Sequence, residues 1–322
     1  MTRILLVKTS SMGDIVHALP VVADIHGACP GAEIHWLVEE SYSTVPRMHP
    51  GIARVIVVAF RRWRNQLFHR DTWREIAAYR RKLREPHDYV IDAQGLTKSA
   101  LLALAARGPR CGYAWGSGRD DFATLFYQRR FEVSLGIHAV ERNRQLVAAS
   151  IGYALPETLD YGICAPPRAE FPGLYELAAQ PYAVLLHATS RPEKFWPEDR
   201  WVALGVHLQR QGIRSLLPWG GAEERARSER LAAAIPEARL PPALSLSALA
   251  ALLGDAHAVV GVDTGLTHLA VALGRPTVGL YCATEPGLNG VYGKATAVNL
   301  GGMGTPPTVE KVVETLARIA PP

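Results

Sequence analysis

Asp14 is the first residue whose type and position suggest chemistry. It ends the segment 8–14, KTSSMGD, which follows the apolar run Arg3–Val7 and precedes an apolar segment that begins at Ile15. A strand, a glycine turn and a helix often form a phosphate site, but a carboxylate at the helix start is unsuited to phosphate. We interpret Asp14 as the acceptor of a proton from a reacting hydroxyl. With an ordinary pKa of about 4, it can take that proton only within the transition state.

The segment 262–270, VDTGLTHLA, ends a predicted strand and begins a predicted helix. Asp263, Thr264 and Gly265 lie at the helix start, where exposed N–H groups and the helix dipole attract phosphate. His268 follows one turn later, where its side chain could contact the same ligand. The commoner interpretation is that Asp263 only caps the helix and that His268 is packed, so this segment needs support from other parts of the chain.

The segment 187–197, HATSRPEKFWP, combines hydroxyls with cations directly after another predicted strand. Thr189 and Ser190 offer hydroxyl donors, and Arg191 and Lys194 offer positive charge. This combination suits a diphosphate. The alternative is a surface loop with ordinary turn residues.

The segment 218–224, PWGGAEE, ends a third predicted strand with glycines and then offers Glu223 and Glu224. A carboxylate at this place can accept hydrogen bonds from a ribose diol, although two acids also stabilise a helix start. The chain contains no Walker motif, and no GxGxxG motif follows a strand. These absences argue against an ordinary P-loop or nicotinamide site.

Positive charge is concentrated in one part of the chain. The net charge is +5, but residues 47–84 hold eleven Arg or Lys and two acids, a local +9 that leaves −4 for the rest. Such a stretch indicates an anionic partner, whether phosphate, carboxylate, nucleic acid or a membrane surface, or else a solvated helix face. Arg61, Arg62 and Arg64 flank Trp63 just after the predicted strand 55–60, near the strand end where a ligand would bind.

Strand-like and helix-like segments alternate in both halves of the chain, which predicts an α/β protein with two parallel sheets. We expect a first domain at 1–165, a proline-rich linker at 166–181 and a second domain at 182–322. The terminal helix, 309–319, packs within its own domain or back on the first. Pro20 should interrupt the first helix. Ligands are expected outside the carboxyl ends of the strands, in a cleft between the two domains.

Composition sets the remaining limits. The 322 residues suggest about two domains, and 48% apolar and 20% charged residues are ordinary for a globular protein. No apolar run is long enough to cross a bilayer, and we recognise no signal peptide. Four scattered cysteines indicate reduced thiols in a cytoplasmic protein. No paired-carboxylate motif accompanies the phosphate segments, so we expect no metal and no other cofactor.

Together these segments predict a sugar-nucleotide site on the second domain and an acceptor hydroxyl presented by the first. In this hypothesis Asp14 takes the proton as the hydroxyl attacks the anomeric carbon. Lys194 and the helix start at Thr264 would stabilise the departing diphosphate.

The order of motifs resembles a known family. KTSSMGD, VEE, RRWR, DAQGLTKSA, HAVER, LHATSRPEKFWP, LPWG and VDTGLTHL resemble the lipopolysaccharide heptosyltransferases of glycosyltransferase family 9, type I in particular, over nearly the whole chain. The resemblance implies the GT-B fold of two facing Rossmann-like domains. It also implies inverting transfer of L-glycero-D-manno-heptose from ADP-heptose to the first Kdo of Kdo2-lipid A. We further expect a cytoplasmic monomer in peripheral contact with the inner membrane, without nucleic acid.

The resemblance also assigns roles to residues. It makes Asp14 the general base and Glu224 the ribose-binding carboxylate, with Glu223 as the alternative, and it places Leu244 where relatives have a methionine near the adenine. The residues expected around the donor diphosphate and heptose are Thr189, Ser190, Lys194, Asp263, Thr264, Gly265 and His268. Apart from the resemblance, we expect arginines to contact the anionic groups of the acceptor, namely Arg61, Arg62, Arg64 and Arg119.

Three alternatives stay open at this point. Heptosyltransferase II acts on the heptose just added, but its first loop lacks the KTSSMGD form. A nucleic-acid-binding protein would use the basic stretch and show salt-dependent RNA binding without ADP binding, but it leaves Asp14 and the second-domain segments unexplained. A sugar-nucleotide hydrolase or epimerase would differ from a transferase in its products with and without a lipid acceptor.

Overall fold

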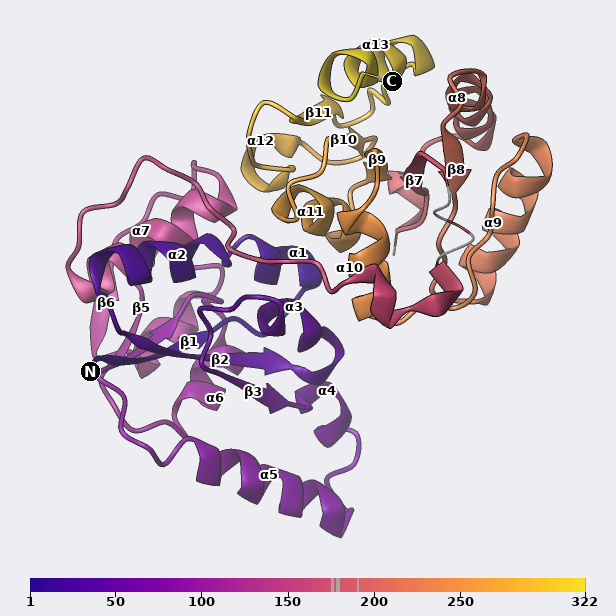
Figure 1. Ribbon diagram of the computed structural model, residues 1–322. Coiled ribbons are helices and arrows are strands. Elements are labelled where there is room, and N and C mark those ends of the chain that lie inside the picture. The colour runs from indigo at the N-terminus through magenta and orange to yellow at the C-terminus, as the bar shows by residue number, and fades with distance from the viewer. Residues whose placement is uncertain (175–176, 178–179, 190, 322) are drawn as a thin grey trace. The chain divides into compact units, whose positions relative to one another are not determined.

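The computed structural model describes residues 1–174, 177, 180–189 and 191–321. The chain divides into two units, Met1–Ile163 and Cys164–Pro322, which Figure 1 draws from indigo to yellow along the chain. The division lies two residues before the predicted domain boundary. The part of the predicted linker that is described packs on the second unit, where Arg168 Nε lies 3.6 Å from Asp255 Oδ2.

The first unit contains a parallel sheet of six strands in the order β3-β2-β1-β4-β5-β6. Its strands are β1 (Arg3–Val7), β2 (Glu33–Glu39), β3 (Arg54–Val58), β4 (Tyr89–Asp92), β5 (Arg110–Tyr113) and β6 (Arg129–Phe131). Residues 4–7 are fully buried, as expected for a parallel strand covered on both faces. The strand order reverses between β1 and β4, and the loops after these two strands therefore meet at the switch point where such sheets bind ligands.

Helices cover both faces of this sheet (Figure 1). They are α1 (Met12–Val16), α2 (Pro20–Ala28), α3 (Thr44–Arg47), α4 (Phe60–Trp63), α5 (Arg70–Lys82), α6 (Thr97–Ala103) and α7 (Ala139–Ile151), with the 3-10 turns η1 (Glu40–Tyr42) and η2 (Asp121–Phe126). Pro20 begins α2, which confirms the predicted break because proline suits the first turn of a helix and not its interior. The predicted strand 55–60 ends at Val58 instead, and Phe60 begins α4.

The second unit contains a parallel sheet in the order β11-β10-β9-β7-β8. Its strands are β7 (Tyr182–Leu186), β8 (Arg214–Leu216), β9 (Ala258–Val262), β10 (Thr277–Tyr281) and β11 (Ala297–Gly301). Its helices are α8 (Glu198–Arg210), α9 (Ala222–Ala234), α10 (Leu246–Gly254), α11 (Gly265–Ala272), α12 (Pro286–Asn289) and α13 (Val309–Ile319), with the 3-10 turns η3 (Arg168–Glu170), η4 (Pro172–Leu174) and η5 (Pro192–Lys194). The switch point of this sheet lies between β7 and β9.

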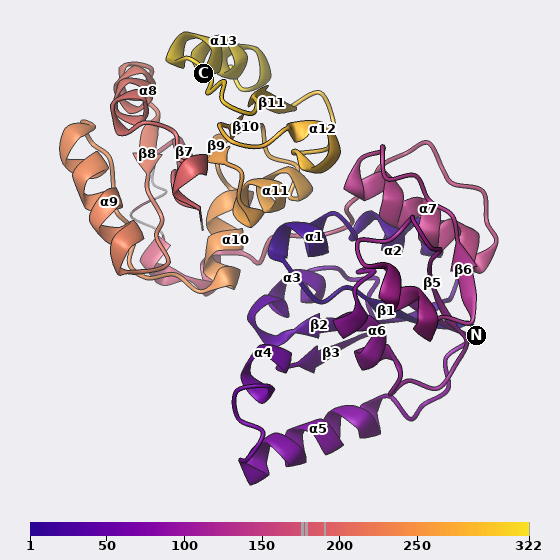
Figure 2. The same ribbon diagram turned by 180° about the vertical axis from the view of Figure 1, so that it is seen from behind.

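The prediction of two parallel α/β sheets is confirmed. The terminal helix α13 packs on α8 and β10 of its own unit, and Val312, Leu316 and Ile319 join that unit's apolar core. Figure 2 shows the same arrangement from behind. None of the helices in the described part of the chain is both long and apolar enough to cross a membrane.

We expect acid to destabilise the fold, because three buried histidines resist protonation in the folded state. Burial is the main cause that lowers the pKa of His49, His87 and His187 to about 4, whereas histidine in an unfolded chain titrates near 6.5. As pH falls, the unfolded state binds protons first, so stability is full above about pH 6.5 and is lost toward pH 4. We expect the free energy of unfolding to fall by roughly 1–2 kcal/mol per histidine between about pH 7 and pH 5.

Urea unfolding at several pH values, followed by circular dichroism, checks this expectation. The variant His187→Gln should show a smaller loss between pH 7 and pH 5 than the parent chain. A free energy of unfolding that stays constant over this range would contradict the prediction.

Candidate active site

The loops after β7 and β9 meet at the switch point of the second sheet, because these two strands are neighbours. Lys194 Nζ lies 2.5 Å from Asp263 Oδ2. The Thr189 hydroxyl donates to the carbonyl oxygen of Asp263 at 3.2 Å. The structure therefore brings together the segments 187–197 and 262–270, each of which the sequence analysis assigned to the donor diphosphate. Ser190, which was assigned to the same ligand, lies outside the described residues.

Asp263 is the centre of this cluster. The Thr284 hydroxyl donates to its Oδ2 at 3.0 Å, and His268 Nε2 lies 3.9 Å from its Oδ1. Burial would raise the pKa of Asp263, but the hydrogen bonds from His268, Lys194 and Thr284 and the charge of Lys194 together hold it far below its usual range. Asp263 is thus an anion held among donors. In the described ranges, no group of three or more His, Cys, Asp or Glu side chains could hold a metal ion.

The alternative that Asp263 only caps α11 is not what the structure shows. The N-cap residue is Thr264, with φ −146° and ψ 157°. Its side chain makes no capping hydrogen bond to the helix within the described part of the chain. A helix start that its N-cap side chain leaves uncapped, as at Thr264, is suited to an external acceptor such as phosphate. Sequence reasoning missed Thr284, although a hydroxyl just after the predicted strand β10 was the signal.

The residues expected to contact the nucleoside lie at the start of α9 and in the loop before α10. Glu224 occupies the third position of α9, and its Oε2 accepts the N–H of Gly220 at 2.7 Å. Its partly buried carboxylate is thereby oriented, whereas Glu223 is exposed. Leu244 is half-buried in the loop before α10. Contacts of these residues with ribose and adenine stay predictions.

In the first unit, Asp14 faces an arginine. The guanidinium of Arg119 lies against its carboxylate, with Nη2–Oδ1 at 2.8 Å and Nη1–Oδ2 at 3.3 Å. Asp14 is also the third residue of α1, and its Oδ2 accepts the N–H of Ser11 at 2.9 Å. The carboxylate of Asp14 therefore has two structural partners at the start of α1, the N–H of Ser11 and the guanidinium of Arg119. Arg119, expected at the acceptor, is thus the direct partner of Asp14.

Charge keeps Asp14 ionised. Burial alone would raise its pKa, but the charges of Lys8 and Arg119 and the N–H of Ser11 outweigh burial and lower it. Lys8 was missed by sequence reasoning, although a lysine directly after a buried strand was the signal. It is 5% exposed, and its Nζ donates to Ala93 O at 2.7 Å and to Asn143 Oδ1 at 3.1 Å. Burial is the main cause that lowers its own pKa to about 8.

The motif DAQG supports the loop that carries Asp14. Oε1 of Gln94 accepts the N–H groups of Thr9 and Ser10 at 3.0 and 3.1 Å. The Asp92 carboxylate in turn accepts the N–H of Gln94 at 2.9 Å and the hydroxyl of Ser99 at 2.8 Å. The loops after β1 and β4 are therefore joined by buried hydrogen bonds, which fixes the backbone beside Asp14.

A cationic pocket of about 380 Å³ lies beside this loop. Its lining residues are Thr9, Glu39, Phe60, Arg61, Arg64, Lys98 and Leu102. Arg62 is not among them, because its guanidinium pairs with Glu40 at 3.1 Å and with Glu75 at 2.8 Å. The structure thus separates Arg61 and Arg64 from Arg62, although the role predicted for all three stays a prediction.

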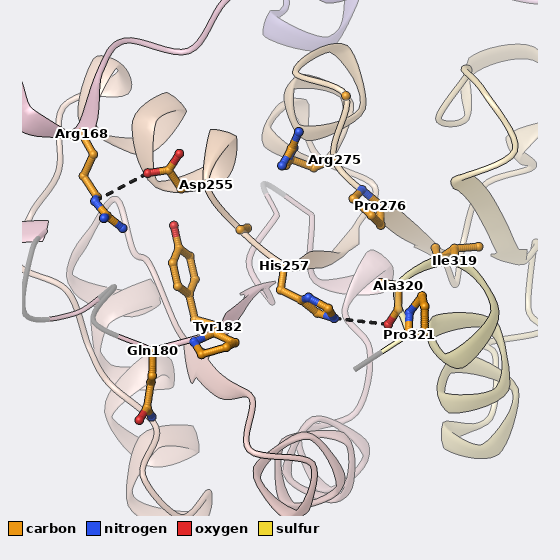
Figure 3. A pocket seen from close by; sticks show the side chains of 13 residues that line it. Arg168, Gln180, Tyr182, Asp255, His257, Arg275, Pro276, Ile319, Ala320 and Pro321 are labelled. Atoms are coloured by element: carbon orange, nitrogen blue, oxygen red, sulfur yellow. Dashed lines mark hydrogen bonds and ion pairs between the residues drawn. The ribbon is translucent and has the colours of Figure 1, made fainter.

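A second hollow, of about 710 Å³, lies at the opposite edge of the second sheet. Figure 3 shows Arg168 paired with Asp255, and His257 in contact with Ala320. The hollow lies at the N-terminal ends of the strands β7, β9 and β10. Because ligands of parallel sheets bind at the carboxyl ends of strands, we assign function to the cluster of Lys194 and Asp263 instead.

Comparison with known proteins gives consistent matches. The family model "Glycosyltransferase family 9 (heptosyltransferase)" matches residues 76–316. The lipopolysaccharide heptosyltransferase 1 of Escherichia coli strain K12 is 45% identical over 295 residues, 91% of each chain. The solved structure of E. coli heptosyltransferase WaaC with ADP has a TM-score of 0.89 and 41% identity, covering 99% of this chain and 100% of its own. WaaC with ADP-2-deoxy-2-fluoro heptose has a TM-score of 0.85 and 40% identity, covering 98% and 99%.

Proposed function

Because the chain belongs to glycosyltransferase family 9, the heptosyltransferases, we propose that it moves L-glycero-D-manno-heptose from ADP-heptose to the first Kdo of Kdo2-lipid A. Its fold is GT-B, as predicted. The observation that carries the proposal is Asp14, a carboxylate kept ionised at the strand ends of the first unit. An ionised carboxylate at such a place is suited to take a proton from an acceptor hydroxyl.

The donor diphosphate is proposed to bind at the start of α11. Lys194 would lie against its oxygens, with Thr189 and Thr264 as further donors, because cations and free N–H groups at a helix start suit phosphate. Asp263 holds Lys194 in place at 2.5 Å. The related structures solved with ADP and with an ADP-heptose analogue support this choice of ligand.

The transfer is proposed as a single displacement with inversion. The acceptor oxygen attacks the anomeric carbon, the bond from that carbon to the diphosphate oxygen breaks, and the hydroxyl proton passes to Asp14. ADP leaves with the electron pair of the broken bond, and its charge is offset by Lys194 and the start of α11. Atoms and charges balance with the two substrates alone, so the proposal includes no metal or other cofactor.

The acceptor is proposed to present its anionic groups to the cationic pocket of the first unit. Arg61 and Arg64 line that pocket, and Lys98 adds a third cation. Kdo carboxylates and lipid A phosphates are the anions that arginine forks bind well. Since this acceptor is a membrane lipid, the proposal includes peripheral contact of a monomer with the cytoplasmic face of the inner membrane.

The double variant Arg61→Ala/Arg64→Ala should raise the apparent KM for Kdo2-lipid A by about tenfold, with the donor KM little changed. Both arginines are exposed at the pocket, so the fold should tolerate their loss. Raised salt should reproduce part of the effect in the parent chain. Steady-state kinetics with each substrate varied in turn measure both constants.

The matched control is Arg210→Ala/Arg318→Ala, which removes the same charge from exposed positions of the second unit. It should leave the acceptor KM unchanged. An unaltered acceptor KM in a folded Arg61→Ala/Arg64→Ala variant would remove these arginines from the acceptor site and leave the donor site untouched.

Release of ADP tests the reaction class. We expect ADP release from ADP-heptose to require Kdo2-lipid A. Equal release without any acceptor would indicate a hydrolase. A preference for an acceptor that already carries one heptose would indicate the type II enzyme.

A further inference from the structure

The segment 66–84 presents large apolar side chains to solvent. Phe68 is 101% exposed, Trp73 58% and Leu67 48%. The indole N–H of Trp73 donates to the carbonyl oxygen of Leu67 at 2.8 Å, which holds these two residues together at the start of α5. Grouped apolar side chains on a surface mark a place of interaction.

Cationic side chains surround this apolar group. Arg70, Arg80, Arg81 and Lys82 are exposed, and within the part of the chain that the structure describes they form no ion pair. The first unit holds 21 Lys or Arg and 16 Asp or Glu, a net +5, while the 14 and 14 of the second unit cancel. The charge that would attract an anionic surface therefore lies with the apolar side chains of the segment 66–84.

Hydrogen bonds and an ion pair connect the segment 66–84 to α4, which carries part of the cationic pocket. The indole N–H of Trp63 in α4 donates to Glu75 Oε2 in α5 at 2.7 Å, and Arg62 Nη2 lies 2.8 Å from the same oxygen. Figures 1 and 2 both show α5 along the border of the first unit, with α4 beside it. Because α4 also carries Arg61 of the pocket, whatever binds α5 is held at a set position relative to the pocket.

We infer that the segment 66–84 docks the first unit on an anionic phospholipid bilayer, with Phe68 and Trp73 inserted among the headgroups and the arginines on lipid phosphates. An apolar group within a basic helix suits the boundary between headgroups and acyl chains, and each basic residue near an anionic leaflet adds attraction. The inference rests on the proposed function, because a lipid acceptor gives the enzyme a reason to bind this surface.

A nucleic acid fits the charge of the segment but not its apolar group. Binding to phosphate backbones depends on cations and salt, and exposed Leu67 adds nothing to it. A bilayer uses both features. Loss of vesicle binding on removal of apolar side chains, at constant charge, is therefore the result that distinguishes the two partners.

The test is sedimentation of the full chain with vesicles made of equal parts phosphatidylcholine and phosphatidylglycerol. We expect Phe68→Ser/Trp73→Ser to weaken partition by about tenfold or more. Arg80→Glu/Arg81→Glu should do the same and should abolish the preference for phosphatidylglycerol over pure phosphatidylcholine. Vesicles with brominated acyl chains should quench the parent's tryptophan fluorescence more than that of Trp73→Phe.

The matched control is Trp115→Ser/Phe122→Ser, which removes one tryptophan and one phenylalanine of substantial exposure, 66% and 68%, beside Asp120 and Asp121. It should bind vesicles as the parent does. Parent-like binding by Phe68→Ser/Trp73→Ser, equal loss in the control, or RNA binding in place of vesicle binding would each overturn the inference. Transferase activity on a deacylated, water-soluble acceptor separates the two proposals. The variant Phe68→Ser/Trp73→Ser should retain this activity. If the parent chain lacks this activity, the proposed function fails, and the inference about bilayer binding is unaffected.

Discussion

Asp14→Asn is expected to lower kcat by about a hundredfold or more while ADP-heptose binds almost as before, the loss typical of removing a general base. Asparagine keeps the shape of the side chain and can still accept the N–H of Ser11. It can no longer take a proton. Steady-state rates together with calorimetric binding of ADP measure the two quantities separately.

The pair of Asp14 with Arg119 requires its own control, because the Asp14→Asn substitution also leaves the guanidinium without its carboxylate partner. Arg119→Met keeps the base and removes the cation, whose nearest contact with Asp14 is 2.8 Å. If Asp14 is the base, Arg119→Met should lose less kcat at saturating acceptor than Asp14→Asn. Turnover within a few-fold of the parent in a folded Asp14→Asn variant would reject Asp14 as the base.

Lys194→Ala is expected to weaken ADP binding and to lower kcat/KM for the donor by roughly a hundredfold, the size expected for losing a preorganised charge at a leaving group. Lys194 is 14% exposed and Asp263 is 19% exposed. Loss of the ammonium therefore leaves a carboxylate that is mostly buried, and that carboxylate would repel the diphosphate. ADP affinity by calorimetry and donor kinetics check both effects.

The same loop offers a matched control in Arg191, whose side chain is 55% exposed and lies 3.6 Å from Glu193. Arg191→Ala removes an equal charge and should have a far smaller effect. A thermal unfolding curve shows whether Lys194→Ala has also lost the fold. If Lys194→Ala binds ADP and reacts as the parent does, Lys194 belongs to a surface loop and the diphosphate site is wrong.

Much of the fold could be predicted because its strands are apolar and its helix signals are local. Pro20 begins α2 where a proline must, and α13 has the predicted bounds, Val309–Ile319. β5, β6 and β11 were not predicted, because Arg110–Tyr113, Arg129–Phe131 and Ala297–Gly301 are short and contain no long apolar run. Such strands form only when the neighbouring strand supplies the hydrogen bonds.

The candidate site could be predicted by segment, but not by contact. The segments that follow strands contain Asp14 in the first unit and Lys194 and Asp263 in the second, because the carboxyl ends of the strands meet at one edge of each parallel sheet. The pair of Asp14 with Arg119 joins residues 105 positions apart, and no local pattern specifies such a pair. The same holds for Arg62, whose glutamate partners set it apart from Arg61 and Arg64 only in the folded chain.

Mass spectrometry of the lipid tests the central claim most directly. The purified chain is incubated with ADP-heptose and Kdo2-lipid A, and parallel samples omit the donor or replace the chain with Asp14→Asn. We expect the lipid to gain the mass of one heptose residue in the complete reaction, with little gain in the Asp14→Asn sample and none without the donor. An unchanged lipid mass in the complete reaction, with a folded chain that binds ADP, would contradict the account.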